Sequence, residues 1–207
     1  MKKIKVRVDL DDVLNKFSEY FLDVHYKHTG EELDFVSWDL HKHSKFGLDI
    51  WNHLERPDFF LNAPVEHNAK KLIDYLDIHG SVFEYFIVSS YYGDDDKVFD
   101  YIYKQKKMWL LKHFSEKASR RLILVNGSKK DFPADIVIDD YWKNLVEGVD
   151  ESLKLFYVRD HNKNIMIDTD YLKKVNTEGD GHNEIINILS DVVFFNDIES
   201  YLKNEFS

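Results

Sequence analysis

The sequence contains no cysteine, and it is poor in the residues that mark linkers and repeats. The absence of cysteine from all 207 residues excludes disulfides, thiolate metal sites and cysteine nucleophiles. Only 8 glycines and 3 prolines are present, and no repeat or low-complexity tract interrupts the chain. The length therefore corresponds to one full domain, or to one domain with a modest insertion.

Long apolar runs are also absent. The chain opens on Met1-Lys2-Lys3-Ile4 and passes directly into a strand pattern, with no apolar stretch of signal-peptide length. No later run approaches the roughly 18 apolar residues of a membrane span. We therefore expect a soluble, cytoplasmic protein that does not contact a membrane.

An excess of basic residues is missing as well. The chain has 28 Lys and Arg against 38 Asp and Glu, a net charge of -10, whereas a protein that binds nucleic acid polymers needs a basic surface. A single nucleotide is not excluded, because one metal ion and one lysine can meet its phosphate. What the chain does have is 43% hydrophobic and 15% aromatic residues, enough for a sizeable core.

The apolar residues follow strand and helix spacings in turn. Ile4, Val6 and Val8 alternate with polar residues, as in a strand. Further strand patterns cover residues 82–88, 122–125, 134–138 and 154–158, and helical patterns cover 66–77, 97–114, 185–189 and 197–202. This alternation predicts an α/β fold with a doubly wound, mainly parallel sheet. We expect a core of residues 1–14 and 80–207, and a small helical cap inserted at residues 15–79.

Acidic side chains follow two of the predicted strands. Asp9 and Asp11 leave the first strand, and Asp139 and Asp140 leave the strand at 134–138. The carboxyl ends of parallel strands meet at one edge of a sheet, so these carboxylates should lie close together. Crowded carboxylates repel one another, and a hard divalent cation is the usual compensation. The sequence therefore predicts a Mg²⁺ site.

The same edge of the sheet carries residues suited to a phosphomonoester. A carboxylate that attacks phosphate faces charge repulsion, which a metal ion offsets. The transition state spreads charge over the phosphoryl oxygens, so a lysine and a hydroxyl should point there, and Lys129 and Ser89 each follow a strand. Asp11 would serve as the acid and base.

Four ordered motifs resemble those of the haloacid dehalogenase superfamily. They are Asp9-Leu10-Asp11-Asp12-Val13-Leu14, Ile87-Val88-Ser89-Ser90, Lys129 and Ile138-Asp139-Asp140. Within the superfamily the chain looks most like the 5′(3′)-deoxyribonucleotidases, and the resemblance covers most of the chain up to about residue 165. The narrower likeness comes from residues 56–61 (Arg-Pro-Asp-Phe-Phe-Leu), residues 86–90, the ten-residue step from Lys129 to Asp139, and His161-Asn162.

The resemblance implies a role for each acidic residue. Asp9 would be the nucleophile and a metal ligand. Asp11 would be the acid and base, and its backbone carbonyl would also bind the metal. Asp140 would be the third protein ligand, supported by Asp139.

The resemblance also implies how substrate is held. Ser89 and Lys129 would hold the phosphate, with Ser90 beside them. The aromatic residues of the cap are candidates for stacking on a nucleobase, although such residues at helical spacing are more often core; they are Phe17, Trp38, Trp51, Phe59 and Phe60.

The chain departs from the nucleotidase pattern at three places. Asp12 stands where those proteins usually have glycine, Tyr91 where a proline usually follows the hydroxyl residues, and Gly127-Ser128 where a more basic pair precedes the lysine. These departures leave the phosphatase chemistry intact and bear on the choice of substrate.

Several of these residues could instead have ordinary structural roles. Asp139-Asp140 could cap a helix, as could Ser89-Ser90, and Lys129 could be a surface lysine. The acidic run at residues 94–96 is read as a solvated loop or helix start. The second Asp-x-Asp, Asp168 to Asp170, is rejected as the site because too few residues follow it for further motifs.

The sequence thus predicts a Mg²⁺-dependent phosphomonoester hydrolase acting through an aspartyl-phosphate, with deoxyribonucleoside 5′(3′)-monophosphates as the favoured substrates. The alternatives are a phosphatase for another small phosphomonoester, such as a sugar phosphate, and a non-catalytic nucleotide sensor. Base and sugar preference stay open. So do the role of the chain beyond Asn176 and the oligomeric state, for which a homodimer is one option.

Overall fold

A computed structural model describes residues 2–34, 38–91, 93, 95–147, 151–176, 180–195 and 197–206. Within these residues six parallel strands form one sheet in the order β3-β2-β1-β4-β5-β6. The strands are β1 (Ile4–Val8), β2 (Phe83–Tyr91), β3 (Leu122–Asn126), β4 (Ile136–Asp139), β5 (Leu153–Val158) and β6 (Leu172–Asn176). The strand order reverses at β1, so the doubly wound α/β fold is confirmed, and the carboxyl ends of β1 and β4 flank the reversal.

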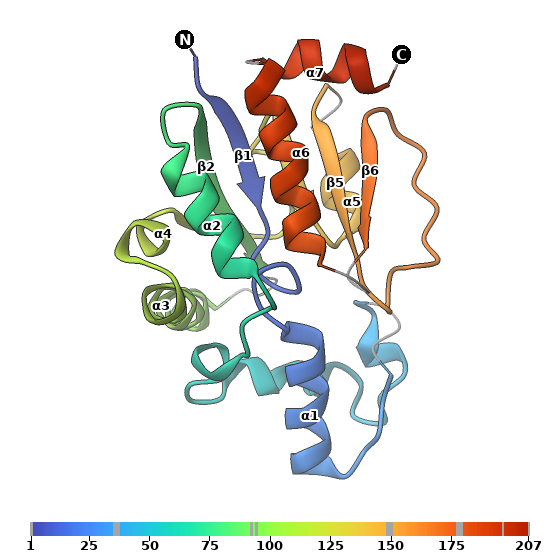
Figure 1. The fold of residues 1–207 in the computed structure, drawn as a ribbon. Coiled ribbons are helices and arrows are strands. Elements are labelled where there is room, and N and C mark those ends of the chain that lie inside the picture. Colours follow the sequence, from blue (N-terminus) through green and yellow to red (C-terminus); the bar gives the residue numbers. More distant parts are fainter. Residues whose placement is uncertain are drawn as a thin grey trace.

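Helices cover both faces of the sheet. They are α1 (Phe17–Thr29), α2 (Ala69–Ile78), α3 (Asp96–His113), α4 (Glu116–Arg120), α5 (Trp142–Val146), α6 (Gly181–Phe195) and α7 (Ile198–Glu205). Helices α2 and α6 lie side by side on one face (Figure 1). On the other face, Leu145 of α5 packs against Val137 and Phe156. Both faces are therefore buried, which explains the nearly continuous apolar runs of the central strands.

The described residues between Asn15 and Val65, which we call the cap segment, lie beyond the carboxyl ends of the strands (Figure 1). The cap segment contains α1 and the 3₁₀ helices η1 (Leu40–Lys42), η2 (Gly47–Glu55) and η3 (Phe60–Asn62). Their apolar side chains form a second core cluster, which also includes Ile102 of α3 and Leu124 of β3. The two chain segments that join this part to the sheet run antiparallel: Asn15 bridges Val65, and the Lys16 N–H donates to the Pro64 carbonyl at 2.9 Å.

Helix α2 belongs with the sheet, although the sequence placed it in the cap at residues 15–79. Its Leu72, Ile73 and Leu76 are fully buried in the cluster that includes the strands. The helix follows the second connecting segment, and its apolar stripe faces the sheet rather than α1. The division of the chain into two domains stays a prediction.

The C-terminal part differs from the expected pattern in two ways. Strand β6 is not among the strands that the sequence predicts, because two lysines in it hide the alternation. Lysine suits such a strand because β6 is at the edge of the sheet. Helix α6 is longer than expected and covers the sheet with Ile185, Leu189 and Val192.

Two smaller expectations can also be compared with the structure. Asp95 caps helix α3, because its side chain accepts hydrogen bonds from the backbone N–H groups of Lys97 and Val98; Asp94 lies outside the described residues. Asp168 and Asp170 are exposed in a loop before β6. Among the described residues, no helix combines the length and the apolar character that crossing a membrane requires.

The packing of α2 predicts unequal effects for the same substitution at two of its positions. Ile73 is 1% exposed and Ile78 is 78% exposed. Ile73→Ala should lower the free energy of unfolding by about 2–5 kcal/mol, because it leaves a cavity in the sheet's core. Ile78→Ala should change it by no more than about 0.5 kcal/mol. Urea denaturation measures both, and equal losses would contradict the placement of α2 on the sheet.

Candidate active site

Three buried aspartates meet where β1 and β4 end. The two strands are paired through Val8 and Ile138, and the pairing continues as the Asp9 N–H donates to the Ile138 carbonyl at 2.9 Å. One carboxylate oxygen from each of Asp9, Asp139 and Asp140 lies within 4.8 Å of the others. The structure therefore brings together, from adjacent strands, carboxylates that are 130 residues apart in sequence, as the strand-end argument predicts.

Burial makes this cluster electrostatically unfavourable. Burial and the charge of Asp139 raise the pKa of Asp9 well above its usual range. Burial and the charge of Asp12 do the same to the pKa of Asp140. In addition, Asp140 Oδ1 is buried and accepts no hydrogen bond from the part of the chain that the structure describes. These oxygen donors fit a hard divalent cation, which would supply the missing positive charge.

Lys129 supplies one compensating charge. Its Nζ lies 2.7 Å from Asp9 Oδ1 and 2.9 Å from Asp139 Oδ2, and the side chain is buried. Burial by itself would lower the pKa of Lys129, but the charges of Asp139 and Asp9 outweigh it, and the net shift is upward. Lys129 is thus held as an ammonium group at the site, in the place where the sequence expects a phosphate-binding lysine.

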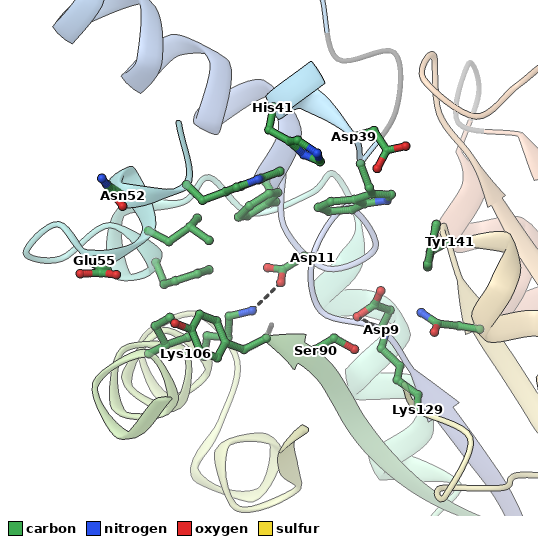
Figure 2. Close-up of a pocket in the computed structure, with 18 of the residues that line it drawn as sticks. Asp9, Asp11, Asp39, His41, Asn52, Glu55, Ser90, Lys106, Lys129 and Tyr141 are labelled. Carbon is green, nitrogen blue, oxygen red and sulfur yellow. Dashed lines mark hydrogen bonds and ion pairs between the residues drawn. The ribbon is translucent and has the colours of Figure 1, made fainter. Parts of the chain in front are cut away.

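Asp11 pairs with a second buried lysine, which the sequence analysis did not identify. Lys106 Nζ lies 2.5 Å from Asp11 Oδ2 (Figure 2). It also donates to Ser89 Oγ at 2.7 Å and lies 4.4 Å from the centre of the Phe60 ring. A signal was present in the sequence. Lys106 occupies the same face of α3 as the buried Ile102 and Trp109, and a lysine among apolar residues at helical spacing must find a buried partner.

The two serines of the second motif have different surroundings. Ser89 is fully buried and is engaged with Asp11 and Lys106, because its hydroxyl donates to Asp11 Oδ2 at 3.1 Å. Ser90 lines the cavity above the site, and its buried Oγ has no hydrogen-bond partner among the described residues. Of the two serines, therefore, Ser90 is the one that lines the cavity and whose hydroxyl has no hydrogen-bond partner among the described residues.

A cavity of about 600 Å³ separates the sheet from the cap segment. Its floor carries Asp9, Asp11, Lys106 and Lys129 (Figure 2). The aromatic side chains that line it are Phe17, Trp38, Trp51, Phe60, Tyr91 and Tyr141. Of the five aromatic candidates from the sequence, Phe59 alone does not line the cavity; its ring packs against the ring of Tyr20, with centroids 5.2 Å apart. The cavity thus has a charged floor and a largely aromatic wall.

Asp12 has a backbone conformation that is unusual for a residue other than glycine. Its φ is 60°, the left-handed conformation that favours glycine, which is the residue that the resemblance expects at this position. The carboxylate compensates by accepting hydrogen bonds from the N–H group of Ser18, at 2.9 Å, and from the Ser18 hydroxyl. Asp12 therefore ties the loop after β1 to the first turn of α1.

The loop after β5 supports the same region. His161 Nε2 lies 3.1 Å from Asp140 Oδ2, and Asn162 Nδ2 donates to the Asp140 carbonyl at 2.8 Å. Arg159 Nε donates to the Asp12 carbonyl at 2.9 Å. The His161-Asn162 pair, singled out in the sequence, thus surrounds Asp140.

The chain is similar to known proteins in sequence and in fold. The model of the family described as 5′ nucleotidase, deoxy (Pyrimidine), cytosolic type C protein matches residues 2–175. Two relatives named 5′(3′)-deoxyribonucleotidase, from Bacillus subtilis (strain 168) and Bacillus phage SPbeta, are each 26% identical over a 175-residue alignment. The alignment covers 79% of this chain and 90% of each relative. A solved structure described as a haloacid dehalogenase-like hydrolase from Burkholderia xenovorans LB400 matches with a TM-score of 0.52. It is 12% identical and covers 93% of this chain and 99% of its own, so the likeness concerns the fold.

The aspartate cluster predicts that Mg²⁺ stabilises the folded protein. At a concentration 100 times its Kd, a ligand that binds only the folded state stabilises it by about 2.7 kcal/mol. We expect Mg²⁺ to raise Tm in the wild type and in Asp168→Asn, whose changed residue is an exposed loop aspartate. The increase should disappear in Asp140→Asn. Equal Mg²⁺-dependent shifts in wild type and Asp140→Asn, measured by thermal unfolding with chelator as reference, would refute the site.

Proposed function

The chain belongs to the family of 5′-nucleotidases, deoxy (pyrimidine), cytosolic type C, and from this premise we propose that it hydrolyses deoxyribonucleoside 5′(3′)-monophosphates through an aspartyl-phosphate on Asp9. The haloacid dehalogenase-like fold and the nucleotidase relatives make it a phosphatase of this general kind. The observation that supports the specific mechanism is the position of Asp9, which lies buried on the floor of the cavity beside Lys129.

Asp9 is oriented for attack by its own hydrogen bonds. The Leu10 N–H donates to Asp9 Oδ1 at 2.6 Å, and Lys129 Nζ contacts the same oxygen. Oδ2 is then the oxygen that forms the new bond to phosphorus, while the bond from phosphorus to the ester oxygen breaks. Lys129 and the Ser90 hydroxyl face the phosphoryl oxygens, where negative charge spreads in the transition state.

The acidic trio supports the assignment of a magnesium site. Asp9, Asp140 and the backbone carbonyl of Asp11 would hold Mg²⁺, with Asp139 in support. When bound, the ion would offset the repulsion between the phosphate and the attacking carboxylate. The buried Asp140 Oδ1, without a hydrogen-bond partner among the described residues, is the atom whose environment such an ion would complete.

Asp11 is placed to move the proton. Asn15 Nδ2 donates to its Oδ1 at 3.0 Å, and Lys106 holds its Oδ2. An entering phosphate dianion competes for the Lys106 ammonium group, and the Asp11 carboxylate, once released, takes up a proton from solvent and passes it to the leaving oxygen. Asp11 then takes a proton from the water that attacks the aspartyl-phosphate, so phosphate leaves and Asp9 is restored.

The walls of the cavity favour a nucleobase. Phe17 and Trp38 are stacked with ring centroids 5.6 Å apart, and both line the cavity. Flat aromatic faces suit a base, which stacks through its π-system. A sugar phosphate is the second candidate because polar side chains also line the cavity on the cap side; they are Asp39, His41, Asn52 and Glu55.

Turnover on a panel of substrates tests the proposed function. Phosphate release should be measured from deoxyribonucleotides, ribonucleotides and sugar phosphates, each with Mg²⁺ and with chelator. We expect Mg²⁺-dependent release from deoxyribonucleotides, reduced more than about 1,000-fold in Asp9→Asn because the nucleophile is lost. Release from sugar phosphates alone would keep the mechanism and refute the nucleotidase assignment. No release from any compound would favour the nucleotide sensor.

The contact between Lys106 and Asp11 predicts that Lys106 affects turnover. Lys106→Met should lower kcat by about 100-fold or more, because the acid and base group loses the ammonium group that positions it. Lys107→Met is the matched control, since Lys107 is on the same helix but exposed. Steady-state kinetics on the best substrate measures both variants. Unchanged kcat in Lys106→Met would show that the buried pair serves folding only.

A further inference from the structure

Arg7 is the last residue but one of β1, two residues before Asp9, and is 1% exposed. In the sequence, Arg7 is one of the polar residues that alternate with the apolar residues of that strand. In the structure both faces of the sheet are covered, so its guanidinium group is buried. Alternation along the strand puts Arg7 on the same side of the sheet as Asp9. A buried arginine uses its donors inside the protein, and the partners of the two terminal nitrogens of Arg7 lie at the site. Its Nε has no hydrogen-bond partner among the described residues.

Three backbone carbonyls accept hydrogen bonds from this guanidinium group. Arg7 Nη1 donates to the carbonyls of Lys129 and Phe132, each at 3.0 Å, and Nη2 donates to the carbonyl of Asn144 at 2.5 Å. Two of these residues lie in the loop between β3 and β4, and Asn144 lies in α5. One side chain from β1 thus fixes the backbone of two separate segments.

Both segments supply side chains to the floor of the cavity. Lys129 contacts Asp9 and Asp139, and Asn144 Nδ2 donates to Asp139 Oδ1 at 3.1 Å. Lys129 and Asn144 both line the cavity. Among the described residues, the hydrogen bonds of Arg7 all go to backbone carbonyls, and Arg7 itself does not line the cavity. Its charge also acts on Asp139 and Asp9.

From this juxtaposition we infer that Arg7 is a positioning residue, which sets Lys129 and Asn144 in register with Asp9 and so determines where the phosphate is held. The inference rests on the proposed function for its catalytic consequence but not for the contacts themselves. Arginine suits the task because its planar group carries five donors in a fixed geometry, whereas one ammonium group cannot reach three carbonyls with the same precision.

The sheet offers a matched control in Lys154 of β5. Arg7, Val137 and Lys154 are successive partners across β1, β4 and β5. Lys154 is fully buried, and its Nζ donates to the carbonyls of Ser152 and Asp170, at 3.3 and 3.0 Å. Neither of those residues lines the cavity. Removing either cation should destabilise the fold, but only Arg7 should affect the site.

The experiment compares Arg7→Met, Arg7→Lys and Lys154→Met in the full chain, with thermal unfolding to establish the folded fraction. Amide hydrogen exchange is followed in residues 127–133 and 141–146, and kcat and KM are measured on the best substrate. We expect faster exchange in both segments in Arg7→Met but not in Lys154→Met. We also expect kcat of Arg7→Met to fall about 100-fold, since small displacements of catalytic groups have effects of this size.

Arg7→Lys keeps the charge and should give intermediate values, and it covers the case in which Arg7→Met does not fold. Wild-type exchange in both segments of Arg7→Lys and of folded Arg7→Met would overturn the inference. So would a loss of kcat no greater than that of Lys154→Met at equal folded fraction. If the wild type itself shows no turnover, the proposed function fails, while the exchange comparison still decides whether Arg7 holds the two segments.

Discussion

The crowding of buried negative charge at the carboxyl ends of β1 and β4 is the constraint on which the rest of the site depends. Asp9, Asp139 and Asp140 are buried, with carboxylate oxygens within 4.8 Å of one another. Asp11, two residues after Asp9, is buried as well. Charges in such surroundings are tolerated only when they are paired or bound to a metal. Cations from different elements compensate this charge. Lys129, from the loop after β3, pairs with Asp9, and Lys106 of α3 pairs with Asp11. The charge of Arg159, from the loop after β5, acts on Asp140.

This compensation also links the site to the cap segment. Asn15, in the first connecting segment, donates to Asp11, and Asp12 accepts from the first turn of α1. Lys106 lies over Phe60, whose ring lines the cavity. Movement of the cap relative to the sheet would therefore disturb the groups around Asp11. In the proposed reaction, closing the cap over substrate would therefore also set the orientation of Asp11, the acid and base.

Much of the fold and the site follows from short sequence patterns. Alternation in β1 and short apolar runs elsewhere predicted five of the six described strands, and the residues that leave β1 and β4 predicted the acidic cluster. Lys129 was expected from its position after a strand. The patterns were less informative where a residue's environment depends on distant parts of the chain. Helix α2 was assigned to the cap because spacing shows that a stripe is apolar but not what covers it. Strand β6 was missed because an edge strand tolerates lysines that break the alternation.

The α/β order and the carboxylates at the strand ends can be predicted from the sequence, because they depend on residue type and local spacing. Only the tertiary structure showed that Lys106, 95 residues from Asp11 in sequence, is its partner, and that Ser89 faces inward while Ser90 faces the cavity. It alone showed that Arg7 is buried beneath the site rather than exposed. The physical reason is that local spacing fixes the side of a strand or helix on which a side chain lies. Its burial and its charge partners are fixed by whichever distant segment packs against that side.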